Sequence, residues 1–241
     1  MRKVTTLFLL LFLLLLFVKC KNTSTTQAFY LNGNFIGIRV GNTVKFYETK
    51  DGKTWAYSPN KDFASPDHTD NIIYFGGSYI GDRQGKTVKF YVTNRQGIWT
   101  YSPGKDFTSA DDVDGIFYFN NSSLGVWQGK TIKFYETNIH GSWSASTIKD
   151  FTGTTNIDGA FYLTGSFIGV RDGRTVKFYM LNEQGNWTYS PGKDFVSMDD
   201  VDDIFYLKTG QIGVLKDKTI KFYAINDKGI WTHSPGAGLN F

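Results

Sequence analysis

The residue types best suited to chemistry occur together in a motif that recurs along the chain. One copy spans residues 187–195 and reads WTYSPGKDF. Trp187 and Tyr189 are two residues apart, so on an extended segment they share one face. An indole face stacks against the C–H face of a pyranose, while a carboxylate, an ammonium group and a hydroxyl bind its OH groups. The motif therefore predicts a shallow carbohydrate-binding site.

Four further copies place similar residues at the same spacing. The third copy has lost the tyrosine and the fifth has lost the aspartate, so we expect fewer than five full-strength sites. The candidate stacking residues are Trp55, Trp99, Trp143, Trp187, Trp231, Tyr57, Tyr101, Tyr189 and His233. The candidate hydrogen-bonding residues are Asp62, Asp106, Asp150 and Asp194 and the strand lysines Lys45, Lys89, Lys133, Lys177 and Lys221.

Each of these residues also has a purely structural interpretation, which the sequence leaves open. The tryptophans can form a core between repeats. The Lys-Asp pair of the motif can be an exposed salt bridge in a turn, which contributes little to stability. A lysine kept in every copy needs a partner or a ligand if it is buried, unless its ammonium group reaches the rim.

Acidic clusters precede the Phe-Tyr segment of two repeats, at Asp111, Asp112 and Asp114 and again from Asp199 to Asp203. They suggest calcium, but the number of acids is not kept in the other repeats and no EF-hand spacing is present. We interpret them as solvated turns and strand entries. The sequence predicts no metal and no cofactor.

Catalysis needs different residues in different roles, such as an acid and a base with separated pKa values. Few acidic residues occur at positions where the other repeats have a different residue. Glu48 and Glu136 share one such position, Glu183 lies in a turn, and Asp82 has no acidic equivalent in the other repeats. The three histidines have no ligand-like spacing and are interpreted as surface residues. We therefore predict a binding protein and not an enzyme, with a glycoside hydrolase as the remote alternative.

The elements that position these residues belong to a repeat of 44 residues. The segment Lys45-Phe46-Tyr47 recurs four more times at this spacing, without insertion or deletion. The fourth copy is rich in β-branched and aromatic residues and holds turn signals such as Asp172-Gly173. Strands are expected there over 160–164, 166–171, 175–181 and 186–190, with Val176 and Phe178 on one face and Lys177 on the other.

Four short antiparallel strands in 44 residues match one propeller blade. The sequence therefore predicts an all-β, five-bladed β-propeller over residues 28–241. The first copy begins with Phe29-Tyr30-Leu31 directly after a polar stretch, while the last copy ends at Phe241 without a following Phe-Tyr segment. We expect the N-terminal strand to complete the last blade and so close the ring.

The first twenty residues have the pattern of an export signal. Arg2 and Lys3 precede an uninterrupted apolar run over 7–18, which is shorter than the roughly 20 residues of a membrane-spanning helix. Cys20 then stands where a bacterial lipoprotein signal has its lipid acceptor, and a polar tether follows over 21–27. The alternative is ordinary cleavage at residues 26–28 and free secretion. Either way we expect a secreted or cell-surface protein, bound to a membrane only through a lipid anchor.

The charge balance of the chain does not favour a nucleic-acid-binding protein. Of the 26 basic residues, Arg2, Lys3, Lys19 and Lys21 lie before residue 22, where no acid occurs. The rest of the chain carries 22 basic and 22 acidic residues. Because a nucleic-acid binder needs a concentrated positive surface, this neutral body excludes nucleic acid as the expected partner.

A five-fold tandem repeat of this length, rich in Trp, Phe, Tyr and Gly, resembles the five-bladed β-propeller lectins of the tachylectin type. The resemblance covers residues 28–241 through repeat number and length, not through blade motifs. It implies a lectin with glycan sites in or between the blades, for ligands such as N-acetylhexosamine, fucose or galactose. No residue role carries over from that family. The alternative from another class is a protein-binding or structural surface propeller without sugar binding.

Overall fold

The computed structural model describes residues 26–31, 34–76, 78–119, 122–207, 210–236 and 238–241. The predicted signal peptide, Cys20 and most of the predicted tether lie outside these residues. The first strand begins at Thr26, within the segment expected to be a tether. Among the described residues, no helix is long and apolar enough to cross a membrane.

The protein is a five-bladed β-propeller, as the repeat predicted. Blade 1 contains β1 (Thr26–Tyr30), β2 (Phe35–Val40), β3 (Thr43–Thr49), β4 (Trp55–Tyr57), the short 3-10 helix η1 (Pro59–Lys61) and β5 (Phe63–Ala64). Blade 2 contains β6 (Asn71–Tyr74), β7 (Tyr79–Gln84), β8 (Thr87–Thr93), β9 (Trp99–Tyr101) and β10 (Phe107–Thr108). Blade 3 contains β11 (Gly115–Phe119), β12 (Ser123–Gln128), β13 (Thr131–Thr137), β14 (Trp143–Ala145) and β15 (Phe151–Thr152).

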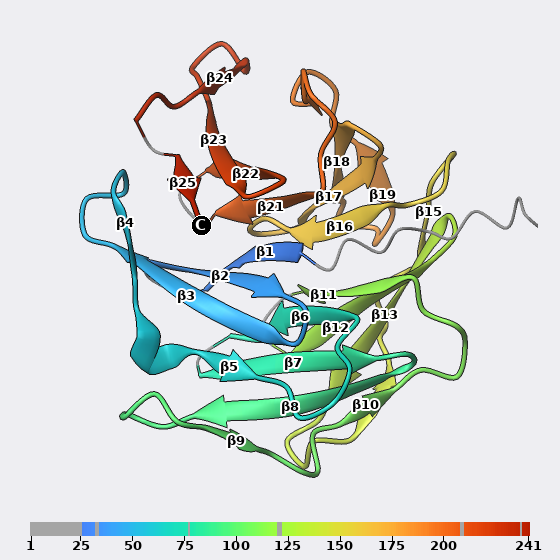
Figure 1. The fold of residues 1–241 in the computed structure, drawn as a ribbon. Helices are drawn as coiled ribbons and strands as arrows, with labels where there is room; N and C mark the ends of the chain where they lie inside the picture. Colours follow the sequence, from blue (N-terminus) through green and yellow to red (C-terminus); the bar gives the residue numbers. More distant parts are fainter. Residues whose placement is uncertain (1–25, 32–33, 77, 120–121, 208–209, 237) are drawn as a thin grey trace, which may run out of the picture.

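The last two blades repeat this pattern. Blade 4 contains β16 (Gly159–Tyr162), β17 (Phe167–Asp172), β18 (Thr175–Leu181), β19 (Trp187–Tyr189) and β20 (Phe195–Val196). Blade 5 contains β21 (Asp203–Leu207), β22 (Gln211–Lys216), β23 (Thr219–Ile225), β24 (Trp231–His233) and β25 (Leu239–Asn240). The sheets surround one centre, and their first strands, β1, β6, β11, β16 and β21, are innermost and contact one another (Figure 1).

Within each blade the strands are antiparallel neighbours in chain order, but the outer edge is divided. The third strand pairs with the fourth over one half of its length and with a two-residue fifth strand over the other half. In β18, Val176 and Phe178 are buried and Lys177 is exposed, which confirms the predicted alternation. The fifth strand was not predicted, because two residues are too few to show a period.

The predicted closure of the ring is wrong. The strand β1 pairs with β2 of its own repeat, with Phe29 opposite Gly37 and Tyr30 opposite Ile36. Every blade is therefore built from one repeat, and the first and last blades meet by packing. A core cluster joins Ile36 and Ile38 of blade 1 to Leu215 and Phe222 of blade 5.

The hydrophobic core lies between blades. One cluster joins Val44 and Phe46 of blade 1 to Ile72 and Ile80 of blade 2, and similar clusters follow around the ring. In four of the five blades, a repeated glycine in the second strand makes room for a phenylalanine ring of the first strand. A Cβ atom at Gly37 would lie 2.4 Å from the Phe29 ring, so only glycine fits there.

Candidate ligand-binding sites

The five predicted stacking tryptophans lie between neighbouring blades. Each indole stacks on a phenylalanine of the third strand of the preceding blade, with ring centroids 5.4–6.0 Å apart. The pairs are Trp99 on Phe46, Trp143 on Phe90, Trp187 on Phe134, Trp231 on Phe178 and Trp55 on Phe222. A phenylalanine thus covers one face of each indole. This is the structural role, a core between repeats, that the sequence left open for the tryptophans.

The indole N–H groups also hold neighbouring blades together. Trp99 donates to the Lys61 carbonyl of blade 1 at 2.7 Å. Trp143, Trp187 and Trp231 donate at 2.8 Å to the carbonyls of Lys105, Lys149 and Lys193. Within the described part of the chain, the Trp55 N–H has no acceptor.

The aspartate of the repeated motif bonds within its own blade. Asp62 accepts hydrogen bonds from the Tyr57 hydroxyl and from the Phe46 amide, at 3.4 Å for the amide. Asp106 bonds Tyr101 and the Phe90 amide in the same way. The carboxylate thereby satisfies a strand N–H at the point where the outer edge of the blade is divided.

The other three copies of the motif differ in whether the tyrosine–aspartate hydrogen bond is present. Tyr189 donates to Asp194 at 2.6 Å. In the third copy, Ala145 stands at the position of the tyrosine, and Asp150 is exposed. In blade 5, His233 is exposed and packs edge-on against Tyr223 at 5.5 Å. The hydrogen bonds raise the pKa of Tyr57, Tyr101 and Tyr189, since each faces an aspartate carboxylate.

Three of the five strand lysines form ion pairs with the acidic clusters. Lys89 pairs with Asp67 at 2.9 Å, Lys133 with Asp111 at 2.7 Å and Lys221 with Asp199 at 3.5 Å. Lys177 is exposed, and the position that holds an aspartate for the other three is occupied by Thr155. The ammonium group of Lys45 lies 5.6 Å from the centre of the Tyr57 ring. Three of the four motif lysines instead cover aromatic rings, as Lys61 covers Phe35 at 3.6 Å, while Lys149 donates to Asn186 at 2.8 Å.

Other acids of these clusters cap turns. The carboxylates of Asp70, Asp114, Asp158 and Asp202 each accept a backbone N–H from the turn between the second and third strands, at 2.6–2.8 Å. Among the described residues, no group of three or more His, Cys, Asp or Glu side chains is placed to hold a metal ion. The clusters are thus accounted for by ion pairs and turns.

Part of the predicted motif does line a pocket. A cavity of about 370 Å³ lies between blades 1 and 2. Its wall includes Trp99 and Tyr91 from blade 2 and Asn60 and Asp62 from blade 1, together with Ile98, which is 58% exposed. This inter-blade pocket therefore combines two aromatic rings with a carboxylate, an amide and an apolar side chain.

A larger cavity, of about 920 Å³, occupies the centre of the ring. The innermost strands line it with five tyrosines, one from each blade: Tyr30, Tyr74, Tyr118, Tyr162 and Tyr206. Burial raises the pKa of Tyr30, Tyr118, Tyr162 and Tyr206. The Tyr162 hydroxyl donates to the Gly165 carbonyl at 2.9 Å.

The start of each innermost strand gives this central cavity an unequal polar wall. The five equivalent residues are Gln27, Asn71, Gly115, Gly159 and Asp203. All of them except Gly115 line the cavity. Gln27 bridges two blades, because its amide donates to the Ile72 carbonyl and accepts from the Ile72 N–H, both at 2.9 Å. Asp203 accepts from the N–H of Ala28 at 3.1 Å and from that of Ile204 at 2.9 Å.

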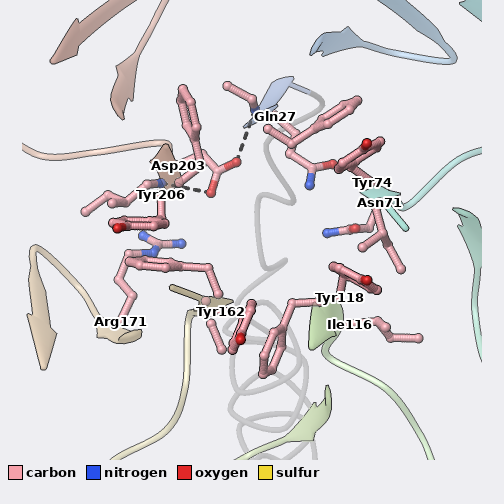
Figure 2. A pocket seen from close by; sticks show the side chains of 18 of the residues that line it. Gln27, Asn71, Tyr74, Ile116, Tyr118, Tyr162, Arg171, Asp203 and Tyr206 are labelled. Carbon is pink, nitrogen blue, oxygen red and sulfur yellow. Dashed lines mark hydrogen bonds between the residues drawn. The ribbon is translucent and has the colours of Figure 1, made fainter. Parts of the chain in front are cut away.

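The environment of Asp203 changes its acidity. Burial raises the pKa of its carboxyl to about 6, although Arg171, the two N–H donors and Arg39 act in the opposite direction. Figure 2 shows the guanidinium of Arg171 below Asp203 on one side of the central cavity, with Asn71 on the opposite side. This wall places a carboxylate, a guanidinium and an amide around one opening.

None of the predicted site residues lines the central cavity. The repeated tyrosines were visible in the sequence, but the polar wall lies where the repeat is broken. The positions 27, 71, 115, 159 and 203 hold two amides, two glycines and one carboxylate, whereas the tyrosine three positions later is the same in every repeat. That contrast is the signal that could have found them.

No protein-family model and no curated protein sequence matches the chain. Among solved structures, the chain is similar to a protein from Lactobacillus plantarum, with 14% identity over 83% of this chain and 67% of that one and a TM-score of 0.47. It is also similar to a functionally unknown protein from Desulfotomaculum acetoxidans, with 12% identity over 90% and 70% of the two chains and a TM-score of 0.49. At such identities the likeness concerns the fold alone.

Proposed function

We propose that the protein binds carbohydrate in pockets between neighbouring blades. The observation that carries the proposal is the inter-blade pocket, where Trp99 and Tyr91 lie beside the polar groups of Asn60 and Asp62. Sugar sites combine an aromatic surface for the C–H face with a few placed acceptors and donors for the hydroxyls. The pocket volume of about 370 Å³ lies in the range of small-ligand sites.

In this proposal, the contacts that the predicted residues already make limit which of their atoms a sugar can reach. Because one face of Trp99 packs on Phe46 and its N–H is bonded to Lys61, the indole offers the sugar only the part that lines the pocket. Asp62 has two hydrogen bonds, yet a carboxylate offers about four acceptor positions, so it keeps capacity for a hydroxyl. Asn60 is exposed on η1, and its side-chain amide supplies donors and an acceptor.

The proposed sites are unequal. None of the other repeats has an asparagine at the position of Asn60, where they have Gly104, Ile148, Gly192 and Gly236. The position of Ile98 holds Thr54, Ser142 and Asn186 in three repeats and keeps an isoleucine, Ile230, in the fifth. The pocket between blades 1 and 2 is therefore expected to bind most strongly. Weaker sites around the ring would add avidity toward a surface that carries many copies of one glycan.

The test uses a substitution that leaves the inter-blade core untouched. A glycan array first identifies a sugar that binds. Isothermal titration with that sugar then compares the wild type with Ile98→Arg, whose long side chain fills the pocket, and with Ile139→Arg at a hairpin residue that is 95% exposed. We expect at least a tenfold loss of affinity for the first and no change for the second. Equal affinities in all three proteins would refute the assignment.

We also propose that the leader directs export and that Cys20 accepts a lipid. The support is the short apolar run followed at once by a cysteine and a polar segment. Mass spectrometry of the protein made in a bacterium, with Cys20→Ser as the comparison, is the test. A lipid-sized mass on Cys20 that disappears in the variant supports the proposal. An N-terminus at residue 28 without added mass favours free secretion.

A further inference from the structure

One buried acid lies between blades 1 and 2. Asp82 on β7 is fully buried. The other four repeats have an aliphatic residue at its position: Ile38, Val126, Val170 and Val214. The Oδ2 atom of Asp82 accepts hydrogen bonds from the Ser65 hydroxyl and, at 3.3 Å, from the Gln84 amide. Within the described part of the chain, its Oδ1 atom has no hydrogen-bond partner. A carboxylate charge at this place is therefore poorly compensated.

Burial favours the neutral form of this acid. It raises the pKa of the Asp82 carboxyl above the ordinary value of 3.8, although hydrogen-bonding neighbours such as Ser65 and the charge of Lys89 act in the opposite direction. The carboxyl therefore retains its proton at pH values at which an ordinary aspartate is already ionised.

A lysine lies between Asp82 and a second carboxylate. Lys89 stands opposite Asp82 in the sheet, and such cross-strand neighbours have Cβ atoms about 5 Å apart. Its ammonium group is nevertheless bonded to Asp67, at 2.9 Å. A lysine side chain is long and flexible enough to serve either carboxylate. The remaining ionisable groups on the neighbouring elements are Arg39, His68, Asp70, Arg83 and Tyr91.

Asp82 and Lys89 together hold the linker between blades 1 and 2, residues 65–70, against blade 2. Blade 1 holds the same linker through backbone groups. The Ser65 N–H, for example, donates to the Asn42 carbonyl at 2.9 Å. The side of the linker that faces blade 2 therefore depends on one buried acid and one ion pair.

The inter-blade pocket shares a wall with this linker. Phe63 and Ala64, which directly precede Ser65, line the pocket. Tyr91 also lines it, lies two residues beyond Lys89 on the same face of β8 and packs on Phe63 with ring centres 4.9 Å apart. A displacement of the linker or of Lys89 therefore reaches the pocket through directly neighbouring residues.

We propose that Asp82 is a pH-sensitive lock, which fixes the linker when it is neutral and releases it when it is ionised, so that the inter-blade pocket binds sugar more tightly at lower pH. Ionised Asp82 draws Lys89 away from Asp67, and the linker then loses its ion pair to blade 2. The control of sugar binding rests on the function proposed above, whereas the effect on the linker does not. The other repeats have an aliphatic residue at this position, so their inter-blade sites lack this control.

Hydrogen exchange followed by mass spectrometry tests the lock without a sugar. Asp82→Asn keeps an acceptor for Ser65 but cannot ionise, and Asp82→Val serves if the first variant fails to fold. From about pH 5 to about pH 8, where ordinary carboxylates stay ionised, we expect the linker amides of the wild type to exchange at least about threefold faster relative to the variant. The linker 109–114 between blades 2 and 3, where Val126 replaces the acid, is the internal control and should exchange alike in both proteins. A rate ratio that stays the same at every pH would overturn the proposal.

Isothermal titration with the sugar that the glycan array identifies tests the control of binding. We expect the affinity of the wild type to fall at least about fivefold over the same pH range and that of Asp82→Asn to stay constant. An affinity that changes equally in both proteins would overturn the control of binding by Asp82. If no sugar binds at any pH, the function proposed above fails and the control of binding fails with it, while the exchange experiment still decides whether the lock exists.

Discussion

Replacing Asp203 by asparagine should change how the stability of the propeller depends on pH. Burial raises the pKa of this carboxyl to about 6 in the folded protein, against 3.8 for an ordinary aspartate. The folded state therefore holds the proton more tightly than the unfolded state. The resulting stabilisation is complete below about pH 3.8 and is lost as the pH rises through 6.

The pKa difference sets the size of the effect. A shift of about two units corresponds to about 3 kcal/mol, so this group should lower the free energy of unfolding of the wild type by about that amount between pH 4 and pH 7. Asp203→Asn removes the titrating group and with it this component. The asparagine can still accept from the Ala28 N–H but loses the second hydrogen bond, worth about 1 kcal/mol. At pH 7 the variant should therefore be about as stable as the wild type or more stable.

Urea unfolding followed by tryptophan fluorescence at several pH values measures this difference. The control is Asp111→Asn, since the ion pair with Lys133 lowers the pKa of Asp111 and gives its contribution the opposite sign. That contribution is present at neutral pH and is lost as the pH falls through the lowered pKa. Parallel pH profiles for the wild type and Asp203→Asn would show that the Asp203 carboxyl titrates normally and that the reasoning is wrong.

Two further changes test the contacts between blades. Trp99→Phe removes the donor to the Lys61 carbonyl and should lower the free energy of unfolding by about 2 kcal/mol, measured by urea unfolding; an unchanged value would contradict the hydrogen bond. Gly97→Ala places a Cβ atom 2.1 Å from the Asn60 backbone oxygen at a φ of +85°, whereas Gly85→Ala meets nothing within 4 Å at a φ of +57°. Thermal unfolding should therefore show a clearly larger loss of stability for Gly97→Ala than for Gly85→Ala. The Gly85→Ala change should cost about 1 kcal/mol because of its positive φ alone. Equal losses of stability in the two variants would exclude the close approach at Gly97.

The architecture could be predicted because it repeats. The spacing of Lys45-Phe46-Tyr47 and its copies determines five equal units, and the alternation around Phe178 identifies the buried face of a strand. The way the ring closes could not be predicted from that spacing. A repeat has no marked beginning, and the pairing of Phe29 with Gly37 depends on how a ring fills the space above a glycine.

The binding sites were harder to predict for a different physical reason. Whether Trp99 faces solvent or a core depends on Phe46, a residue of the neighbouring blade. The sequence of one repeat does not contain that contact. The polar wall of the central cavity depends on which strand is innermost. Residues such as Asn71 and Asp203 come to line one cavity only when the five blades surround one centre. Differences between repeats were therefore more informative about this site than the repeats themselves.

Carbohydrate binding is the central claim, and a glycan-array screen of the purified protein tests it most directly. We predict hits that share one terminal sugar and that weaken in Ile98→Arg but not in Ile139→Arg. A blank array at high protein concentration would contradict the claim. The repeat tryptophans would then serve only to hold the blades together, and the exposed faces of the propeller would be those of a protein-binding scaffold.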